Sequence, residues 1–498
     1  MNRISQAALR HRASIRRLMP KSLHHIVGTL ARGFIRAVES ADGRAGAIAA
    51  GKAPVQFPGP LRPVDAFRKN SVILVNDALS SGGSERQIVN TLVGLKTKSN
   101  LDARLLCWRL DEGPELRFYA DDLLQAGVPF GNVSTEMSAD AADEAAGGDK
   151  ARSDLELREA RAWLDENLEW IPPDVRDKII RLTADLVRHR PGTVHGWQDE
   201  IGLVTAFAGI LAGVPRIVLA TRNVNPSGFG YHRPFMRAAY RIIASLPDLV
   251  FLNNSAAGAR DYETWIGAPT GRFKVLYNGI DFSEIAPPDP SARAAARDNF
   301  GLADASKVIG TVIRFNQEKR PLLWVQTASR ILARFPDVRF IMAGDGPMHA
   351  KTLAEAKRLG LDDRLALPGA VRPIGAVLQA MDVFLLTSQF EGLPNVTMEA
   401  GAAGLPVITT DAGGARETIL IGETGLVVPE ADLIGDNPDE AQLAEALANA
   451  VCTVLEDPAW TERALRLGPA FVRDNFSMDR MIAETVAHYA GNPAAKDT

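Results

Sequence analysis

Apolar residues along the chain fall into two series of short runs separated by longer amphipathic stretches. Runs rich in Val, Ile and Leu that alternate with helical patterns predict parallel strands covered by helices on both faces. The first series predicts strands at Val72–Val75, Arg104–Trp108, Thr193–His195, Arg216–Ala220, Leu249–Leu252 and Val275–Leu276. The second predicts strands at Val308–Ile313, Arg339–Ala343, Leu365–Leu367, Val383–Leu386, Val407–Thr409 and Leu426–Val428, with helices such as Leu322–Phe335 and His349–Leu359 between them. The chain is therefore expected to be α/β, with two Rossmann-like domains facing across a cleft.

Breaks in this pattern indicate where the domains begin and end. Three prolines followed by an Ala/Arg-rich stretch at 281–300 predict the join between the domains. This places the N-terminal domain at 69–285 and the C-terminal domain at 300–472. A final helix is expected over 475–492, with Ser477 as its N-cap. Residues 136–160 are acidic and rich in Ala and Gly, which is typical of an insertion or a mobile loop.

The first 40 residues are predicted to form a basic amphipathic helix. Residues 1–38 hold eight Arg or Lys and no acid, and apolar residues recur there at helical spacing. A basic amphipathic helix at 1–40 can lie on an anionic membrane surface, act as an organelle transit peptide, or dock on the protein with a solvated basic face. No secretory signal is expected. The Gly/Ala/Pro-rich segment 41–68 predicts a flexible linker.

Composition narrows the function classes. The 498 residues carry a formal net charge of −4, whereas a dedicated nucleic-acid binder has a basic excess. Two cysteines exclude a disulfide framework and a thiolate zinc site, and they favour a reducing compartment. A cytoplasmic location is expected, either free or peripheral on the inner face of the membrane. The longest uncharged apolar run, 202–214, is too short to span a bilayer and predicts a buried helix.

Candidate chemistry lies in loops that follow strands, because ligands of open parallel sheets bind beyond the carboxyl ends of the strands. Gly82 and Gly83 follow the first strand, and they suit either a phosphate cradle or a tight turn. Arg314 and Lys319 follow the first strand of the second series, where two cations suit a diphosphate or form a solvated basic loop. Gly344 and Asp345 form a turn that would let the backbone approach a bound base or ribose.

The segment after the strand Val383–Leu386 carries two carboxylates. Glu391 lies in a Gly/Pro loop, and Glu399 falls about one turn into the next helix. Glu399 can accept the hydroxyls of a ribose, although a favourable interaction with the helix dipole also explains it. The backbone between the two carboxylates can meet sugar hydroxyls or phosphate, and it comprises Gly392, Leu393, Pro394 and Asn395. Pro394 is expected in the first helical turn. Glu417, after Gly413-Gly414, is expected to be a structural acid at a helix start.

Taken in order, these segments resemble the retaining glycosyltransferases of the GT-B fold in family four, the glycosyl transferases group 1. The resemblance covers most of 71–490. Its motifs are the Gly-Gly loop at 82–83, R-x4-K at 314–319, GDGP at 344–347, E-x7-E at 391–399, DAGGARE at 411–417 and TGLVV at 424–428.

The resemblance implies a role for each motif. Arg314 and Lys319 would hold the donor diphosphate, Glu391 would touch the transferred sugar, and Glu399 would bind the nucleotide ribose. Gly83 would lie against the phosphate or the acceptor side of the cleft. The family implies no metal and no cofactor, a UDP-sugar donor with a GDP-sugar as the alternative, and a final helix that returns to the N-terminal domain.

The acceptor side departs from the family pattern. Many members have a His where this chain has Arg222 and Asn223, so a role of that His does not transfer directly. His195 is a separate candidate for the acceptor side, or a structural histidine. Segment 229–246 alternates aromatic residues and arginines, which suits either an anionic acceptor at a membrane or a simple amphipathic helix. The expected acceptor is a glycan or glycolipid of the cell surface.

The resulting hypothesis is transfer of a sugar from a nucleoside diphosphate to an acceptor hydroxyl with retention. Same-face attack is favoured because no second carboxylate is evident beside Glu391. Two other hypotheses are a sugar-nucleotide epimerase on the same fold and a non-catalytic sugar-nucleotide-binding scaffold. Neither these motifs nor the composition suggests a nucleic-acid partner.

Overall fold

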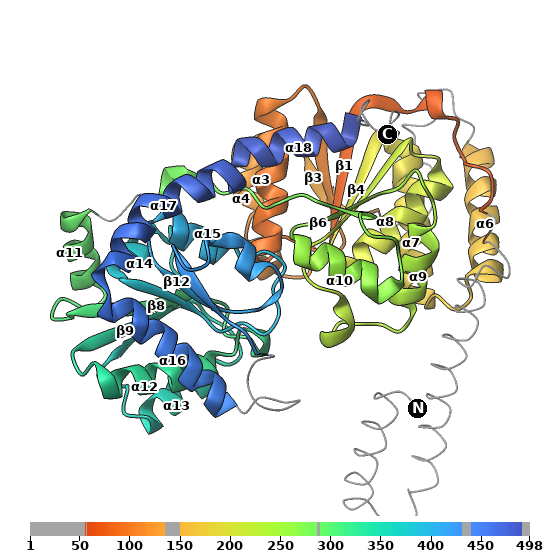
Figure 1. Ribbon diagram of the computed structural model, residues 1–498. Coiled ribbons are helices and arrows are strands. Elements are labelled where there is room, and N and C mark those ends of the chain that lie inside the picture. The colour runs from red at the N-terminus through yellow and green to blue at the C-terminus, as the bar shows by residue number, and fades with distance from the viewer. Residues whose placement is uncertain (1–54, 56, 135–149, 286–288, 431–439, 491–498) are drawn as a thin grey trace, which may run out of the picture.

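A computed structural model describes residue 55 and residues 57–134, 150–285, 289–430 and 440–490 (Figure 1). The basic helix predicted at 1–40 lies outside the described residues. The described chain forms two α/β lobes, each built around one parallel sheet. The expectation of two Rossmann-like sheets is therefore confirmed.

The first sheet has seven parallel strands in the order β3-β2-β1-β4-β5-β6-β7. The strands are β1 (Arg68–Asn76), β2 (Asp102–Cys107), β3 (Phe130–Asn132), β4 (Pro191–Trp197), β5 (Arg216–Thr221), β6 (Val250–Asn253) and β7 (Phe273–Val275). Alternate residues of β1 enter different cores: Ile73 and Val75 face one cluster, and Val72 and Leu74 face the other. Both faces are buried, as the continuous apolar runs predicted. The short edge strand β3 was not predicted.

Helices cover both faces of this sheet (Figure 1). They are α3 (Gly83–Lys98), α4 (Ala120–Gln125), α6 (Lys150–Asn167), α7 (Pro173–His189), α8 (Asp199–Ala212), α9 (Phe235–Ala244) and α10 (Ala256–Ile266). Helix α8 carries the apolar run of 202–214 and is buried along nearly its whole length, as expected.

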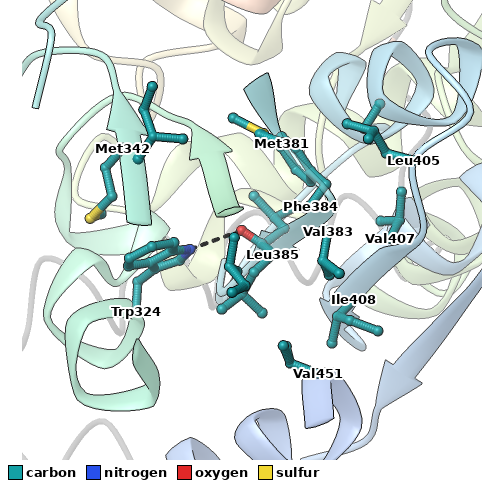
Figure 2. Packing of buried hydrophobic residues seen from close by; sticks show 14 of the residues in the cluster. Trp324, Met342, Met381, Val383, Phe384, Leu385, Leu405, Val407, Ile408 and Val451 are labelled. Atoms are coloured by element: carbon teal, nitrogen blue, oxygen red, sulfur yellow. Dashed lines mark hydrogen bonds between the residues drawn. The ribbon is translucent and has the colours of Figure 1, made fainter. Parts of the chain in front are cut away.

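The second sheet has six parallel strands in the order β10-β9-β8-β11-β12-β13. The strands are β8 (Lys307–Val312), β9 (Val338–Ala343), β10 (Leu365–Ala366), β11 (Val383–Leu386), β12 (Val407–Thr410) and β13 (Gly425–Val428). The helices are α11 (Pro290–Asn299), α12 (Pro321–Arg334), α13 (His349–Arg358), α14 (Gly375–Ala380), α15 (Asn395–Ala402), α16 (Glu440–Glu456) and α17 (Pro458–Phe476). Figure 2 shows how Trp324 of α12 packs in this core, where its indole N–H donates to the carbonyl of Leu385 at 3.1 Å.

Two segments expected to be a mobile loop and a flexible linker pack against the first lobe. Residues 150–160, predicted as part of an insertion or mobile loop, belong to α6, because Leu157, Ala160 and Leu164 bury one helix face against the core. The linker prediction is also wrong for 57–68. Phe57 packs on Trp163 and Phe207, with ring centroids 5.4 and 6.1 Å away. Burial of apolar residues in both segments outweighs their polar, Pro-rich or Ala-rich composition.

Helix α11 precedes the predicted boundary at residue 300, yet it packs on the second lobe. Arg293 and Arg297 form ion pairs with Asp382, and Ala296 is part of the second lobe's core. The join between the lobes accordingly falls within 281–289 rather than across the whole of 281–300.

The chain returns to the first lobe at its end. Helix α17 packs on α15, and α18 (Met478–Ala490) then lies along α3 (Figure 1). Met481 and Ile482 enter the first lobe's core. Ser477 Oγ accepts the N–H of Arg480 at 3.4 Å, as expected of an N-cap. None of the helices in the described ranges combines the length and apolar character needed to cross a membrane.

Candidate active site

Two cavities contain five of the predicted site residues: Gly83, Arg222, Asn223 and Arg314 line one, and Glu399 lines the other. Cavity 1 has a volume of about 410 Å³ and is formed mainly by the first lobe, with Arg314 added from the second. Cavity 2 has a volume of about 470 Å³ and lies between α3 of the first lobe and residues 372–374 and Glu399 of the second. Both volumes are in the range that small-molecule sites occupy. Arg314 lines cavity 1 and Glu399 lines cavity 2, so these two predicted residues line different cavities.

Arg314 and Lys319 come from the loop after β8. Arg314 is exposed and lines cavity 1. Lys319 Nζ donates to Glu391 Oε1 at 2.5 Å, and the Glu391 side chain is only 9% exposed. An ion pair this buried is stable only as a pair, because either partner alone would be an uncompensated buried charge. The structure thus joins two residues that the sequence had placed 72 positions apart.

Glu399 of α15 is the second carboxylate of the motif. It is buried and forms an ion pair with Arg86 near the N-terminus of α3, which crosses from one lobe to the other. Its Oε2 is buried and lacks a hydrogen-bond partner in the described part of the chain. A buried carboxylate oxygen without a partner is an acceptor ready for a donor such as a hydroxyl.

Asn395 joins a polar network between the lobes. Its Oδ1 accepts from Asn278 Nδ2 at 2.8 Å and from Gln87 Nε2 at 3.3 Å. Its Nδ2 donates to the carbonyl of Gly83 at 3.2 Å. Leu393, whose carbonyl accepts from Asn278, has a buried side chain in the second core. Asn395 and Leu393 therefore hold the lobes together in this structure.

Several loop residues are placed differently from expectation. Pro394 precedes α15 at the N-cap rather than lying in its first turn. Gly82 holds the same position in α3. At Gly344, with φ of +133°, a Cβ would come within 1.8 Å of the carbonyl oxygen of Ile313. This glycine is therefore required by the close approach to the loop that carries Arg314. Asp345 is exposed and its Oδ1 accepts the N–H of Gly346.

Arg222 lies at the carboxyl end of β5 and lines cavity 1 with Asn223. Its guanidinium stacks on Trp197, 3.4 Å from the ring centroid. Nη1 donates to Asn278 Oδ1 at 3.2 Å. Burial lowers the pKa of Arg222 to about 9, so the group is still charged at neutral pH. Its backbone also meets the second lobe, since a Cβ on Gly392 would come within 2.2 Å of the Arg222 carbonyl oxygen.

His195 is buried in the first lobe and does not line either cavity. Its Nδ1 is 2.7 Å from the hydroxyl of Tyr489 in α18. Burial holds the pKa of His195 well below its ordinary value, so the ring is neutral. These contacts pack His195 of β4 against the returning helix α18, away from the lining of both cavities.

Within 229–246, the amphipathic helix α9 covers Phe235–Ala244, and Tyr231 and Arg233 precede it. Phe235 and Tyr240 are buried in the first core, and Arg233 is paired with Asp174 and Glu200. Tyr231 is 50% exposed. The aromatic residues of α9 therefore do not form the exposed membrane-facing surface that was one of the two expectations.

One carboxylate in the lining of cavity 1 was not predicted from the sequence. Asp199 begins α8, is 6% exposed, and accepts from the hydroxyls of Tyr231, Tyr240 and Tyr262. Burial raises the pKa of Asp199 to about 6, against the lowering effect of the tyrosine hydrogen bonds. The three tyrosines are distant from Asp199 in the sequence, so no local motif predicts the cluster.

Glu85 of α3 also lines cavity 1 and was not singled out. Its Oε1 accepts from Gln198 Nε2 at 3.0 Å. Burial raises the pKa of Glu85, while the charge of Arg314 acts in the opposite direction. Within the described ranges, no group of three or more His, Cys, Asp or Glu could hold a metal ion.

Glu417 bridges the lobes. Its two carboxylate oxygens accept the N–H groups of Ala256 and Ala257 at 2.8 and 2.7 Å, at the start of α10, and the hydroxyl of Tyr277 at 3.1 Å. The residue is a structural acid at a helix start, as expected. The helix, however, belongs to the other lobe, where the carboxylate meets the positive end of the helix dipole.

Two facing parallel sheets closed by a returning C-terminal helix define the GT-B class of two-domain transferases. HepE of Anabaena in complex with UDP-glucose has this fold, with a TM-score of 0.62 and 20% identity over 84% of this chain and 99% of that one. The apo lipopolysaccharide outer core galactosyltransferase WaaB matches with a TM-score of 0.56 and 15% identity, over 84% of this chain and 99% of that chain.

The chain belongs to the glycosyl transferases group 1, the retaining GT-B family four. The model of that family matches residues 306–457. The Vi polysaccharide biosynthesis protein VipC/TviE of Salmonella typhi is 30% identical over 452 residues, covering 86% of this chain and 73% of that protein. The UDP-Gal:alpha-D-GlcNAc-diphosphoundecaprenol alpha-1,3-galactosyltransferase of Escherichia coli is 28% identical over 45% of this chain and 58% of its own length. The protein is thus a nucleotide-sugar glycosyltransferase of the hexosyltransferase type.

Proposed function

We propose that the protein transfers a sugar, with retention, from a UDP-sugar to a hydroxyl of a glycan or glycolipid in cell-surface polysaccharide synthesis. The observation that carries this proposal is the loop after β8, where Arg314 lines cavity 1 and Lys319 forms a buried ion pair with Glu391. Similarity to the Salmonella typhi Vi polysaccharide protein supports the polysaccharide context, and the UDP-glucose complex of HepE supports a UDP donor.

The main chemical requirement of this reaction is to stabilise the negative charge of the leaving diphosphate. In a transition state with oxocarbenium character, negative charge builds up on the departing phosphate oxygens. Arg314 and Lys319 supply fixed positive charge at the position where it develops, which lowers the barrier without a reorganisation cost. Lys319 bonds Glu391 in the structure, so this lysine can hold the sugar-contacting carboxylate and the diphosphate together.

The two acidic residues have different tasks in this mechanism. Glu391 contacts hydroxyls of the transferred sugar, and Glu399 accepts the ribose hydroxyls through its unpartnered Oε2. Glu391 is paired with Lys319, and the Asp199 carboxylate of cavity 1 is held by three tyrosine hydroxyls. A double-displacement route needs a carboxylate nucleophile at the anomeric carbon. Attack of the acceptor on the same face as the departing diphosphate, with a phosphate oxygen taking the acceptor proton, fits these positions better.

A panel of sugar nucleotides tests the proposal. Thermal stabilisation should single out one donor, since a ligand at 100 times its Kd stabilises the folded state by about 2.7 kcal/mol. The same donor should be hydrolysed slowly without an acceptor. Arg314→Gln should abolish the hydrolysis, whereas Arg358→Gln on the exposed surface of α13 is the matched control.

Three outcomes would contradict the proposal. Isomerisation of the donor without an acceptor would indicate an epimerase, and binding with no turnover for any donor and acceptor would indicate a scaffold. Preference for GDP-sugars would replace the UDP donor while leaving the reaction intact.

The proposal also places the enzyme on the inner face of the membrane, through the basic segment 1–40. Residues 1–38 of this segment carry eight Arg or Lys and no acid, which favours binding to anionic headgroups. Vesicles containing phosphatidylserine should bind the full chain, and removal of residues 1–40 should abolish binding. Equal binding by both chains would exclude this role for the segment.

A further inference from the structure

The unused hydrogen-bond donors of Arg222 are the starting point. Nη1 is occupied by Asn278, but Nε and Nη2 are buried and have no hydrogen-bond partner in the described part of the chain. Nε and Nη2 form one edge of the guanidinium, and this edge matches the two oxygens of a carboxylate. Leaving two charged donors unsatisfied in a buried position is costly unless a ligand completes them.

Stacking on Trp197 fixes the orientation of this edge of the Arg222 guanidinium. The guanidinium plane lies on Trp197, 3.4 Å from the ring centroid. Trp197 is itself fully buried, and its indole N–H donates to the backbone oxygen and the hydroxyl of Ser84, each at 3.1 Å. A guanidinium clamped by stacking loses little further entropy when it binds a planar anion.

The acids of cavity 1 do not neutralise Arg222, because each has a partner elsewhere. The pairs are Asp77 with Arg109, Glu200 with Lys178 and Arg233, Asp199 with three tyrosine hydroxyls, and Glu85 with Gln198. Arg222 and Arg314 are the two cations of this cavity for which the described residues provide no ion pair. The cavity therefore has positive charge available on both lobes.

The neighbours of Arg222 indicate which anion it would meet. Neutral polar groups of Ser84, Gln198, Asn223 and Tyr231 line the same cavity and suit sugar hydroxyls. The Arg222 backbone touches Gly392, next to the Glu391 that the proposed function assigns to the transferred sugar. The diphosphate has its own cations in Arg314 and Lys319. Since the diphosphate is assigned to these two residues, the anion left for Arg222 is one that a sugar ring carries.

We infer that Arg222 recognises the carboxylate of an acidic, uronic-acid-type sugar bound in cavity 1. This inference rests on the proposed function and specifies its substrate class. The carboxylate belongs either to the sugar of the donor or to the terminal sugar of the acceptor. In both cases the two oxygens accept from Nε and Nη2 of Arg222.

Matched ligand pairs that differ only at the sugar C6 test the inference by calorimetry. The donor arm compares UDP-glucuronate with UDP-glucose and UDP-galacturonate with UDP-galactose. The acceptor arm compares methyl glucuronide with methyl glucoside and methyl galacturonide with methyl galactoside, with and without UDP. The wild type should prefer the acid in one arm by about tenfold or more, as expected for a bidentate charged contact.

Variants assign that preference to Arg222. Arg222→Gln should abolish the preference for the acid while UDP affinity changes less than twofold. Arg222→Lys keeps the charge but loses the two-donor edge, so an intermediate preference is expected. Arg222→Lys also serves if the Gln variant does not fold. Arg358→Gln on α13 is the control and should behave as the wild type.

The possible results separate this inference from the proposed function. No preference for acid in either arm, with UDP bound normally, overturns the inference alone. A large loss of UDP affinity in Arg222→Gln would also overturn it, because Arg222 would then be a phosphate ligand. If UDP itself does not bind the wild type, the proposed donor is wrong, and the nucleotide-free methyl glycosides still decide whether Arg222 selects a carboxylate.

Discussion

The two lobes share one architectural plan but place their functional groups differently. In the second lobe, Arg314 and Lys319 lie in one loop, and Glu391 and Glu399 lie eight positions apart, in the loop before α15 and in α15 itself. In the first lobe, the lining of cavity 1 comes from the ends of β1 and β5 and the starts of α3 and α8. Consequently, the proposed donor half appears in the sequence as short motifs, whereas the proposed acceptor half is assembled only by folding.

Removing the cations of the second lobe should give the largest effect. Arg314→Ala combined with Lys319→Ala should lower kcat by about 10³-fold or more, because charge on the leaving diphosphate loses its fixed counter-charges. Initial rates at saturating donor measure this. Since Lys319→Ala leaves Glu391 buried without its partner, the melting temperature of each variant must be recorded as well. Transfer at the wild-type rate in a folded double variant would rule out the leaving-group role.

The Asp199 carboxylate of the first lobe should affect the pH dependence of folding stability rather than the rate of transfer. Burial raises the pKa of Asp199 from 3.8 to about 6, so the folded state holds a proton that the unfolded state releases. Because of Asp199, the free energy of unfolding should therefore fall by about 2 kcal/mol as the pH rises from about 4 to 6. Asp199→Asn should remove this contribution.

Urea unfolding of both proteins at several pH values between 4 and 7 measures the difference. The free energy of unfolding of the wild type relative to Asp199→Asn should fall across this range. A difference that is constant with pH would mean that Asp199 has an ordinary pKa. The first lobe would then not contain a carboxylate whose pKa is raised by burial.

The ribose role of Glu399 predicts a smaller effect confined to binding. Glu399→Gln should weaken UDP binding by about tenfold, or about 1.4 kcal/mol, because a neutral amide is a weaker acceptor for hydroxyls. Titration calorimetry with UDP measures the change. Glu355→Gln on the surface of α13 is the matched control. Unchanged UDP affinity in Glu399→Gln would leave Glu399 only its ion pair with Arg86.

The smallest expected effect concerns the contact between the lobes. Glu417→Gln keeps one acceptor but loses the charge at the start of α10, which should lower stability by about 1 kcal/mol. Urea denaturation detects a change of this size. If stability is unchanged, the contact from Glu417 to Ala256 and Ala257 contributes little to holding the lobes in place.

Local sequence was sufficient for the strands and for the positions of the donor-side motifs. Apolar runs such as Val308–Ile313 and Val383–Leu386 report burial on both faces of a sheet, and a residue after a parallel strand lies at its carboxyl edge whatever the rest of the chain does. This is why Arg314, Glu391 and Glu399 could be selected. The same local view missed the three-residue strand β3 and misjudged residues 57–68 and 150–160, where burial against distant side chains decides the structure.

Partnerships across the chain were decided by the tertiary structure alone. Arg86 meets Glu399, Arg222 stacks on Trp197, and Asp199 gathers three tyrosines. Periodicity and turn chemistry describe neighbours along the chain, whereas these pairs depend on how helices pack on a sheet and how one lobe docks on the other. The sequence by itself therefore determined the family and the location of the motifs to which the proposed function assigns the donor. Only the folded chain decided which charges are paired, which remain available, and hence which anion Arg222 can receive.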